Sequence, residues 1–246
     1  MPSSAKKTKK SAGPHTLAID IGGTGLKASV LNAKGGMEAD RVRVETPYPC
    51  TPAVMVESLT RLIEPLPAFD RVSVGFPGVV REGHIITAPH FGNEVWSRFP
   101  LAKALEKKWG KPARILNDAD IQGLAVMQGK GLELVVTLGT GLGSALFRNG
   151  QLMPHLELAQ HPAHGNKTYN EYVGDKVLKK KGKKKWNKHV KHVLELLNTL
   201  INYDRLYIGG GNSTQLNFKP AANVKIVSNQ AGILGGIALW RDDSLK

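Results

Sequence analysis

Short apolar runs separated by turns fill the first half of the chain. Runs rich in Val, Ile and Leu predict β-strands, and these segments are 17–21, 26–31, 40–45, 71–74 and 113–116. Apolar residues recur at helical spacing from Pro52, where Thr51 or Thr60 could cap a helix, and again over 100–109. A further helix is expected over 119–127. The first half therefore alternates strands with helices.

The second half repeats the opening order of strand, glycine-rich turn and strand. Strands are expected at 132–138 and 144–147, joined by the turn 139–143, and Asn149-Gly150 predicts a hairpin turn after them. A long amphipathic helix follows, whose apolar stripe consists of Trp186, Val190, Val193, Leu194, Leu197 and Leu200. The elements expected after it are the strand 205–208, the turn 209–212, the strand 224–227 and a last helix over 230–240.

The order of these elements predicts an α/β protein. Because strand, Gly/Thr turn and strand occur twice, about half a chain apart, we expect two similar lobes with a central cleft. The expected lobes are 15–117 and 118–246, and the last helix could pack back on the first lobe. Residues 1–14 are basic and rich in Ser and Pro, and we expect them to form a disordered tail.

Composition narrows the class of protein. The 246 residues can bury a sizeable core, and no apolar run approaches the ~20 residues that a membrane span needs. The basic N-terminal residues are not followed by the apolar segment of a signal peptide, so we expect a cytoplasmic protein with no membrane partner. Cys50 is the single cysteine, which excludes an internal disulfide and any multi-cysteine metal site.

Positive charge is the unusual bulk property of the chain. The formal net charge is +14, which indicates a polyanionic partner such as nucleic acid, a membrane surface or a phosphate-rich substrate. Lysines gather in residues 6–10 and again in 176–191, around Gly182 and Trp186. A basic helix face is usually solvated surface, so charge alone does not choose among these partners. Trp186 is expected to anchor its helix to the core.

The first glycine-rich turn has the composition of a phosphate-binding loop. Gly22, Gly23 and Thr24 follow a strand, and glycine lets backbone N–H groups approach an anion closely and adopt positive φ. Lys27 adds positive charge, and the carboxylate of Asp20 could hold Mg²⁺ through water. A tight hairpin with a structural Asp explains these residues equally well, and the spacing fits neither a Walker loop nor a dinucleotide fingerprint.

A second turn of this kind, Gly139-Thr140-Gly141-Leu142-Gly143, changes that balance. Two such hairpins in equivalent halves could hold a phosphate chain from both sides of a cleft. Between them in sequence, Asn117-Asp118 follows a strand and opens a helix. A carboxylate there suits the base that phosphoryl transfer to an alcohol requires, although an Asp at a helix start is more often an N-cap.

Five motifs follow one another along the chain, and together they are more specific than any one alone. They are Asp20-Ile21-Gly22-Gly23-Thr24, Gly75-Phe76-Pro77-Gly78, Leu116-Asn117-Asp118, Leu138-Gly139-Thr140-Gly141-Leu142-Gly143 and Gly209-Gly210-Gly211. In order and spacing, from about residue 16 to 240, the chain resembles the ROK-type sugar kinases, and more narrowly their polyphosphate glucokinase branch. The resemblance implies an actin/hexokinase-like (ribonuclease H-like) fold, Mg²⁺ as cofactor, and a homodimer.

Roles for individual residues come from this resemblance, position by position. It implies that Asp118 is the general base that takes the proton of the sugar 6-hydroxyl. The residues that it implies for binding the phosphate donor are Gly22, Gly23, Thr24, Lys27, Gly139, Thr140, Gly141 and Gly210. Those that it implies for the sugar are Gly78, Asn93, Asn117, Asp118, Glu157, Gln160, His161 and Glu171.

The chain departs from the family pattern in two places. Many ROK kinases have a cysteine-rich zinc loop that this chain lacks, so no zinc is expected. Where the family has Gly-His after Glu157-Leu158, this chain has Ala159-Gln160, with His161 next. Gln160 can still hydrogen-bond a sugar hydroxyl, but one lost hydrogen bond to substrate can cost roughly 1–3 kcal/mol. The sugar, and the level of activity, are therefore left open.

The expected function is transfer of a phosphoryl group from polyphosphate or ATP to the 6-hydroxyl of glucose or a related hexose. The dense lysines favour polyphosphate as the donor. The alternatives are an ATP-dependent hexokinase for another sugar and a catalytically weak sugar-binding relative. Specific nucleic-acid binding is not expected, because regulators of this family have a helix-turn-helix domain where this chain has residues 1–14.

Overall fold

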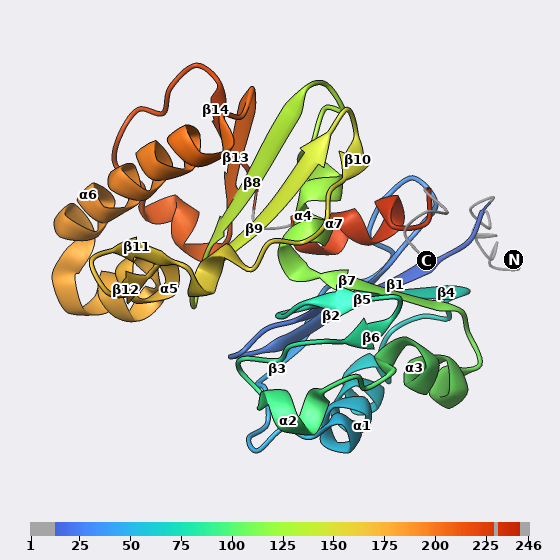
Figure 1. Cartoon of the computed structure of the whole chain (residues 1–246). Helices are drawn as coiled ribbons and strands as arrows, with labels where there is room; N and C mark the ends of the chain where they lie inside the picture. The colour runs from blue at the N-terminus through green and yellow to red at the C-terminus, as the bar shows by residue number, and fades with distance from the viewer. Residues whose placement is uncertain (1–12, 229–230, 242–246) are drawn as a thin grey trace, which may run out of the picture.

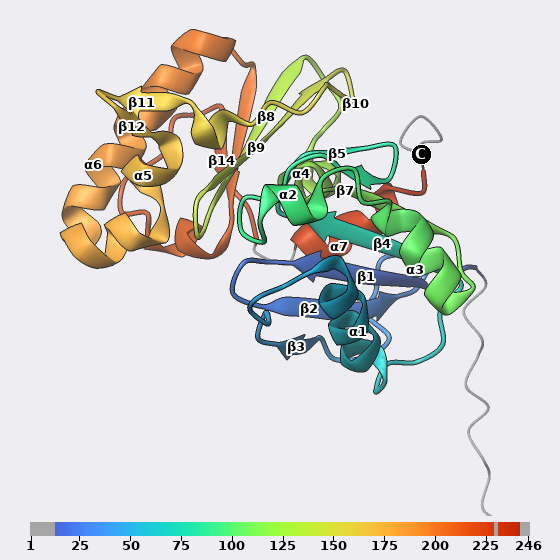
Figure 2. The same cartoon turned by 60° about the horizontal axis from the view of Figure 1, so that its bottom comes forward.

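The computed structural model, which describes residues 13–228 and 231–241, contains two five-stranded mixed sheets with helices packed around them (Figures 1 and 2). The expected tail lies outside the described residues except for Gly13 and Pro14. This mixed α/β arrangement confirms the predicted fold class.

The N-terminal sheet has the strand order β3-β2-β1-β4-β7. Its strands are β1 (Thr16–Ile21), β2 (Leu26–Leu31), β3 (Val42–Val44), β4 (Arg71–Phe76) and β7 (Ala113–Asn117). The helices α1 (Pro52–Ile63) and α3 (Leu101–Trp109) pack on one face of this sheet, as Figure 2 shows. Thr51 is the N-cap of α1, because its side chain accepts a hydrogen bond from the Val54 N–H.

The C-terminal sheet has the order β10-β9-β8-β13-β14. Its strands are β8 (Leu132–Leu138), β9 (Leu142–Arg148), β10 (Gln151–Leu152), β13 (Arg205–Gly209) and β14 (Val224–Ile226). Alternate residues face alternate sides, so that Leu134 and Val136 pack under the helix α6 (Asp175–Ile201), whereas Val135 faces the helix α4 (Asp118–Val126). Trp186 is fully buried in α6 and donates a hydrogen bond to the Val173 carbonyl, which confirms its expected role as an anchor.

The two sheets are built in the same way. In each, the first strand lies in the centre, antiparallel to the second strand and parallel to the fourth. The repeat of strand, Gly/Thr turn and strand in the sequence therefore corresponds to a repeat of topology. As a result, the turn after β1 and the turn after β8 occupy equivalent positions in the two sheets.

Helices α4 and α7 (Ala231–Ala238) pack on each other between the sheets (Figure 1). Ile233 and Ile237 of α7 bury their side chains against the N-terminal sheet. The Ser73 hydroxyl on β4 donates to the Gly236 carbonyl at 2.6 Å, and the Trp240 indole donates to the same hydroxyl at 2.8 Å. The last helix therefore packs on the first sheet, although it follows the second in sequence.

The remaining elements are short, and sequence patterns did not predict them. They are β5 (Val80–Arg81), β6 (His84–Ile85), α2 (Asn93–Trp96), η1 (Leu158–Gln160), β11 (Pro162–His164), β12 (Lys167–Thr168), α5 (Tyr169–Val173) and η2 (Gly211–Gln215). Among the described residues, no helix combines the length and the apolar character that crossing a membrane requires.

Two expectations about helices are wrong in detail. The long helix α6 is interrupted at Gly182, whose φ of 74° and ψ of 160° are not helical. Leu200 does not belong to its apolar stripe, because this residue is 60% exposed, whereas Ile201 packs against the core that contains Leu197. Gln230, the expected start of the last helix, lies outside the described residues.

Candidate active site

A cleft of about 510 Å³ is lined by both Gly/Thr turns and by the start of α4. The loop after β4, the segment after β10, the turn after β13 and residues from Asn170 to Lys179 also line it. The cleft therefore contains residues from both sheets, as the repeated pattern predicts.

The first turn is fixed by hydrogen bonds to its carbonyl groups. The Gly22 N–H donates to the Gly25 carbonyl at 3.0 Å, the Thr46 hydroxyl donates to the Gly22 carbonyl at 2.7 Å, and the Tyr48 hydroxyl donates to the Gly23 carbonyl at 2.6 Å. The N–H groups of Gly23 and Thr24 have no hydrogen-bond partner among the described residues. The turn is thus held by its carbonyl groups and leaves two donors free for an anion.

The second turn leaves the same kind of donors free. The Gly139 N–H donates to the Gly141 carbonyl at 3.0 Å, and the Leu142 N–H donates to the Asn170 side chain at 2.7 Å. Within the described part of the chain, the N–H groups of Thr140 and Gly141 have no partner. The N–H of Asp175, at the start of α6, donates to the Gly139 carbonyl and so fixes the turn to that helix.

The glycines of these turns serve close approach rather than unusual backbone angles. Neither Gly23 nor Gly141 has a positive φ, so the expectation of positive φ is wrong for both turns. A Cβ on Gly141 would overlap the Asn170 side chain, and a Cβ on Gly23 would lie 3.2 Å from the His90 ring. In the third glycine motif, Gly210 does have a positive φ of 83°, and a Cβ there would overlap the Leu138 backbone.

Charged side chains from the first sheet line the same wall. Lys27 Nζ lies 2.9 Å from Asp20 Oδ2, and both side chains are partly exposed. Arg43 lies beside the turn, because a Cβ on Gly25 would come within 2.9 Å of Arg43 Nε. In the described residues, the Gln122 amide oxygen on α4 is buried without a hydrogen-bond partner.

Asp118 is the first residue of α4, and Asn117 rather than Asp118 is the N-cap. The Asn117 Oδ1 accepts from the Ala119 N–H at 2.8 Å, and its Nδ2 donates to the Gly78 carbonyl at 3.0 Å. The interpretation of Asp118 as the cap is therefore wrong. Burial, followed by the negative charge of Asp20, raises the pKa of Asp118 to about 7, although the Ala119 N–H favours its ionised form.

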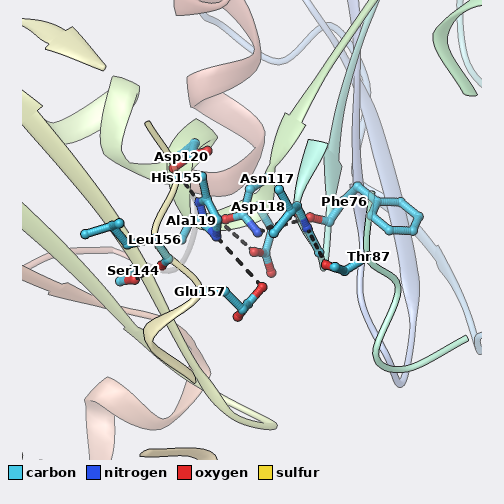
Figure 3. A network of polar contacts seen from close by, with 12 residues as sticks. Phe76, Thr87, Asn117, Asp118, Ala119, Asp120, Ser144, His155, Leu156 and Glu157 are labelled. Atoms are coloured by element: carbon cyan, nitrogen blue, oxygen red, sulfur yellow. Dashed lines mark hydrogen bonds and ion pairs between the residues drawn. The ribbon is translucent and has the colours of Figure 1, made fainter. Parts of the chain in front are cut away.

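A buried histidine, His155, lies between two carboxylates, Asp120 and Glu157, beside Asp118 (Figure 3). Nδ1 of His155 lies 3.2 Å from Asp120 Oδ1, and its Nε2 lies 3.9 Å from Glu157 Oε2. Burial raises the pKa of Asp120 and of Glu157. Burial also lowers the pKa of His155, but the hydrogen bond to Asp120 and the three nearby carboxylates outweigh this effect, and the net shift is upward.

The cleft brings together most of the residues that the sequence singled out. Those in its lining are Asp20, Gly22, Gly23, Thr24, Lys27, Gly78, Asn117, Asp118, Gly139, Thr140, Gly141, Glu157, Gln160 and Gly210. Their roles in binding and catalysis stay predictions. A Cβ on Gly78 would overlap the Thr87 carbonyl, so the sugar-loop glycine is required by packing as well.

Three expected sugar ligands do not lie in the cleft lining. Asn93 accepts a hydrogen bond from the Ala88 N–H and holds its own loop. His161 lies with its Nδ1 2.9 Å from the Pro162 carbonyl oxygen, at the surface. Glu171 forms the capping box of α5 with Thr168. The pattern Thr168-x-x-Glu171 is a known helix-start signature and could have indicated this structural role.

Several cleft residues were missed by the sequence analysis. They are Arg43, His90, Gln122, His155, Asn170, Asp175 and Asn212. Lys179, from the basic segment 176–191 that the sequence singled out, also lines the cleft, and its Nζ lies 2.6 Å from Asp175 Oδ2. His155 precedes Glu157 by two residues, and both line the cleft. That spacing is the signal that could have revealed it.

Comparison with known proteins assigns the family. The ROK family model matches residues 16–165. The chain is 31% identical over 238 residues to the polyphosphate glucokinase of Mycobacterium tuberculosis, covering 90% of this chain and 89% of that protein. It is 34% identical over 143 residues to an N-acetylmannosamine kinase of Escherichia coli, covering 56% of this chain and 49% of that protein.

Solved structures show the same fold. The inorganic polyphosphate/ATP-glucomannokinase of Arthrobacter sp. strain KM superposes with a TM-score of 0.82 at 27% identity, covering 94% of this chain and 100% of that one. A ROK family glucokinase from Streptomyces griseus, solved with glucose and AMPPNP, superposes with a TM-score of 0.71 at 17% identity, covering 92% and 98%. The chain therefore belongs to the ROK family and is similar, over nearly its whole length, to the polyphosphate glucokinases.

Proposed function

We propose that the chain is a sugar kinase that transfers a phosphoryl group from polyphosphate or ATP to the 6-hydroxyl of glucose or a related hexose. The observation that supports this most directly is Asp118, a half-buried carboxylate with a pKa of about 7 in a cleft lined by two Gly/Thr turns. A base with a pKa near the working pH is effective in proton transfer.

In the proposed reaction, Asp118 accepts the proton of the sugar 6-hydroxyl. The sugar oxygen forms a bond to the terminal phosphorus in line, while the bond from phosphorus to the leaving oxygen of the donor breaks. The free N–H groups of Gly23, Thr24, Thr140 and Gly141, together with Lys27, stabilise the charge on the donor's oxygens. On the sugar side, Glu157 and Gln160 line the cleft and are assigned contacts with hydroxyl groups, while Asn117 lines it with its amide bonded to the Gly78 carbonyl and the Ala119 N–H.

The oxygen ligands of the cleft fit Mg²⁺. Asp20 offers a carboxylate, and Gln122 offers a buried amide oxygen with no partner in the described part of the chain. Mg²⁺ prefers oxygen ligands and is commonly held by one or two carboxylates together with the substrate's phosphates. When bound, it would neutralise charge on the phosphates, and Asp20 and Gln122 are the residues that would hold it, directly or through water.

Polyphosphate is the donor that the surface of α6 favours. Its exposed lysines include Lys179, which lines the cleft, together with Lys180, Lys181, Lys183, Lys184, Lys185 and Lys188. In the described residues, only Lys179 of this group has an acidic partner, Asp175. A dense group of exposed lysines, one of which lines the donor site, suits a long polyanion better than a single nucleotide.

The test is a matrix of initial rates with polyphosphate, ATP and GTP against glucose, mannose and N-acetylglucosamine. We expect the highest kcat/KM for glucose with polyphosphate. A preference for ATP would remove the donor role of the α6 lysines but leave the kinase in place. Because Gln160 stands where a His is usual, a second candidate is a weak sugar-binding protein, which glucose binding by titration calorimetry without turnover on any donor would favour.

Two further properties are proposed with this function. A homodimer is suggested by the family resemblance and would be tested by light scattering. A cytoplasmic location is suggested by the lone cysteine, Cys50, whose buried thiol has a pKa raised to about 11 by burial, and would be tested by cell fractionation.

A further inference from the structure

His155 lies at the centre of the polar network beside the candidate base, yet none of the sequence motifs includes it (Figure 3). Its side chain is only 8% exposed, and that of Asp120 is 5% exposed. A buried polar pair of this kind costs stability unless its geometry is good. The pair therefore needs an explanation beyond packing.

The backbone on either side of His155 is held by hydrogen bonds that do not involve its side chain. The Ser144 hydroxyl on β9 donates to the Leu156 carbonyl at 3.0 Å, and the Met153 N–H donates to the Leu146 carbonyl at 2.8 Å. These bonds attach the segment after β10 to β9. The imidazole therefore reaches α4, where its Nδ1 lies 3.2 Å from Asp120 Oδ1.

Among the described residues, the charged groups that act on His155 are all carboxylates. Asp118 and Asp120 face it from α4, and Glu157 faces it from its own segment. Asp118 also faces Asp20 on β1, whose partner is Lys27. A protonated imidazole has two N–H donors and no acceptor, so it can point one at Asp120 and the other at Glu157.

Each contact has a separate consequence for the cleft. The bond to Asp120 sets the ring orientation, and this orientation places Nε2 toward the Glu157 carboxylate on the cleft wall. The positive charge also favours the ionised form of Asp118. Without it, the carboxylates of Asp118, Asp120 and Glu157 would lie together, and no Lys or Arg in the described part of the chain forms an ion pair with any of them.

We infer that His155, oriented by Asp120, is a positioning residue of the sugar site, which aligns Glu157 toward the sugar hydroxyls and supplies the positive charge that keeps Asp118 available as a base. This inference rests on the proposed kinase function. In this inference, the pair of His155 and Asp120 couples sugar binding, through Glu157, to the strength of Asp118 as a base. Asp120 acts only through His155.

The test compares His155→Asn with wild type in steady-state kinetics on glucose and polyphosphate between pH 6 and pH 9. We expect the KM for glucose to rise about 10- to 100-fold, because the hydrogen bond between His155 and the charged Asp120 is lost and Glu157 is no longer aligned. The KM for polyphosphate should change little. We also expect the acid limb of kcat/KM to move to higher pH, so that the loss at pH 6.5 exceeds the loss at pH 8.5. His84→Asn, in the β6 strand outside the cleft lining, is the matched control.

A second pair of variants keeps the inference testable if His155→Asn does not fold. Asp120→Asn retains an acceptor for Nδ1, whereas Asp120→Ala removes it, so the KM for glucose should rise much more in the Ala variant. Equal KM values in these two variants, or an unchanged KM and pH profile in folded His155→Asn, would overturn the inference and leave the kinase assignment intact. A wild-type chain that phosphorylates no hexose with any donor would instead remove both.

Discussion

At the scale of single residues, the neighbours Asn117 and Asp118 divide two tasks between them. The Asn117 side-chain oxygen caps α4, and its side-chain nitrogen donates to the Gly78 carbonyl and so holds that loop. Because Asn117 supplies the cap, the carboxylate of Asp118 keeps an oxygen that is not committed to the helix. Sequence patterns identify the pair but not this division, since either residue is a good N-cap.

The first prediction concerns Asp118 as the base. Asp118→Asn should lower kcat by about 10²- to 10⁴-fold, because the amide cannot accept the proton. Glucose affinity, measured by titration calorimetry, should change little, since the shape of the side chain is retained. Glu57→Gln on the exposed face of α1 serves as a control. A near-normal kcat in Asp118→Asn would show that another group is the base.

The second prediction concerns the effect of Asp118 on stability. Its pKa of about 7 in the folded chain lies above the value of 3.8 expected when unfolded, so the folded chain binds an extra proton between these pH values. Stability therefore falls as pH rises through this window, and ionised Asp118 is unfavourable above it. Asp118→Asn should raise the free energy of unfolding at pH 8 by at most about 4 kcal/mol, and by less toward pH 4. Urea unfolding at several pH values measures this, and a pH-independent difference would contradict it.

At the scale of elements, the two turns show what a sequence pattern can and cannot predict. The strands around each turn follow from local periodicity, and all of them form. Which glycine is indispensable does not follow, because it depends on a distant side chain: Asn170, far along the chain, lies against Gly141. The contact between His155 and Asp120 could not be predicted for the same reason, since the two residues lie 35 positions apart in the sequence.

The third prediction uses this difference between glycines. Gly141→Ala should lower the free energy of unfolding by about 1–3 kcal/mol, because the new Cβ overlaps the Asn170 side chain. Gly139→Ala places a Cβ where no atom lies within 4 Å, and it should be neutral or stabilising by up to about 1 kcal/mol. Equal destabilisation in the two variants, measured by urea unfolding, would refute this explanation.

The fourth prediction concerns the lysines of α6. Replacing Lys183, Lys184 and Lys185 with Gln should lower kcat/KM for polyphosphate about tenfold or more at low salt, because the attraction that concentrates the polyanion is weakened. The value for ATP should stay close to that of wild type. The control replaces three exposed lysines of α3 with Gln: Lys103, Lys107 and Lys108. High salt should reduce the difference between wild type and variant.

At the scale of the whole molecule, the repeated strand pattern was enough to predict two similar halves and a cleft. The short elements around the cleft were not predictable, because two- to five-residue segments carry too little periodicity. The sugar roles of Asn93, His161 and Glu171 stay predictions, and in the structure these side chains lie outside the cleft lining and make local contacts in turns and at a helix start. The lobe boundary between 117 and 118 stays a prediction.

The fifth prediction concerns ligand binding by the folded chain as a unit. Glucose that binds the cleft stabilises only the folded state, and at 100 times its Kd it should add about 2.7 kcal/mol to the free energy of unfolding. Thermal unfolding with increasing glucose measures this. Sorbitol at the same concentration controls for general osmolyte effects. Equal stabilisation by both would argue against a specific glucose site.

The return of α7 to the N-terminal sheet restricts how the two halves can move. The chain passes from the first sheet into α4, and it comes back from β14 to α7, which packs on both α4 and β1. Because the chain connects the two halves twice, at α4 and at α7, the halves can rotate about the line that joins these two connections. They resist twisting and sliding relative to each other. The hinge for opening and closing the cleft is therefore expected along the α4–α7 contact. Small residues such as Gly235, whose Cβ would overlap the Ile121 carbonyl, keep the two axes close there.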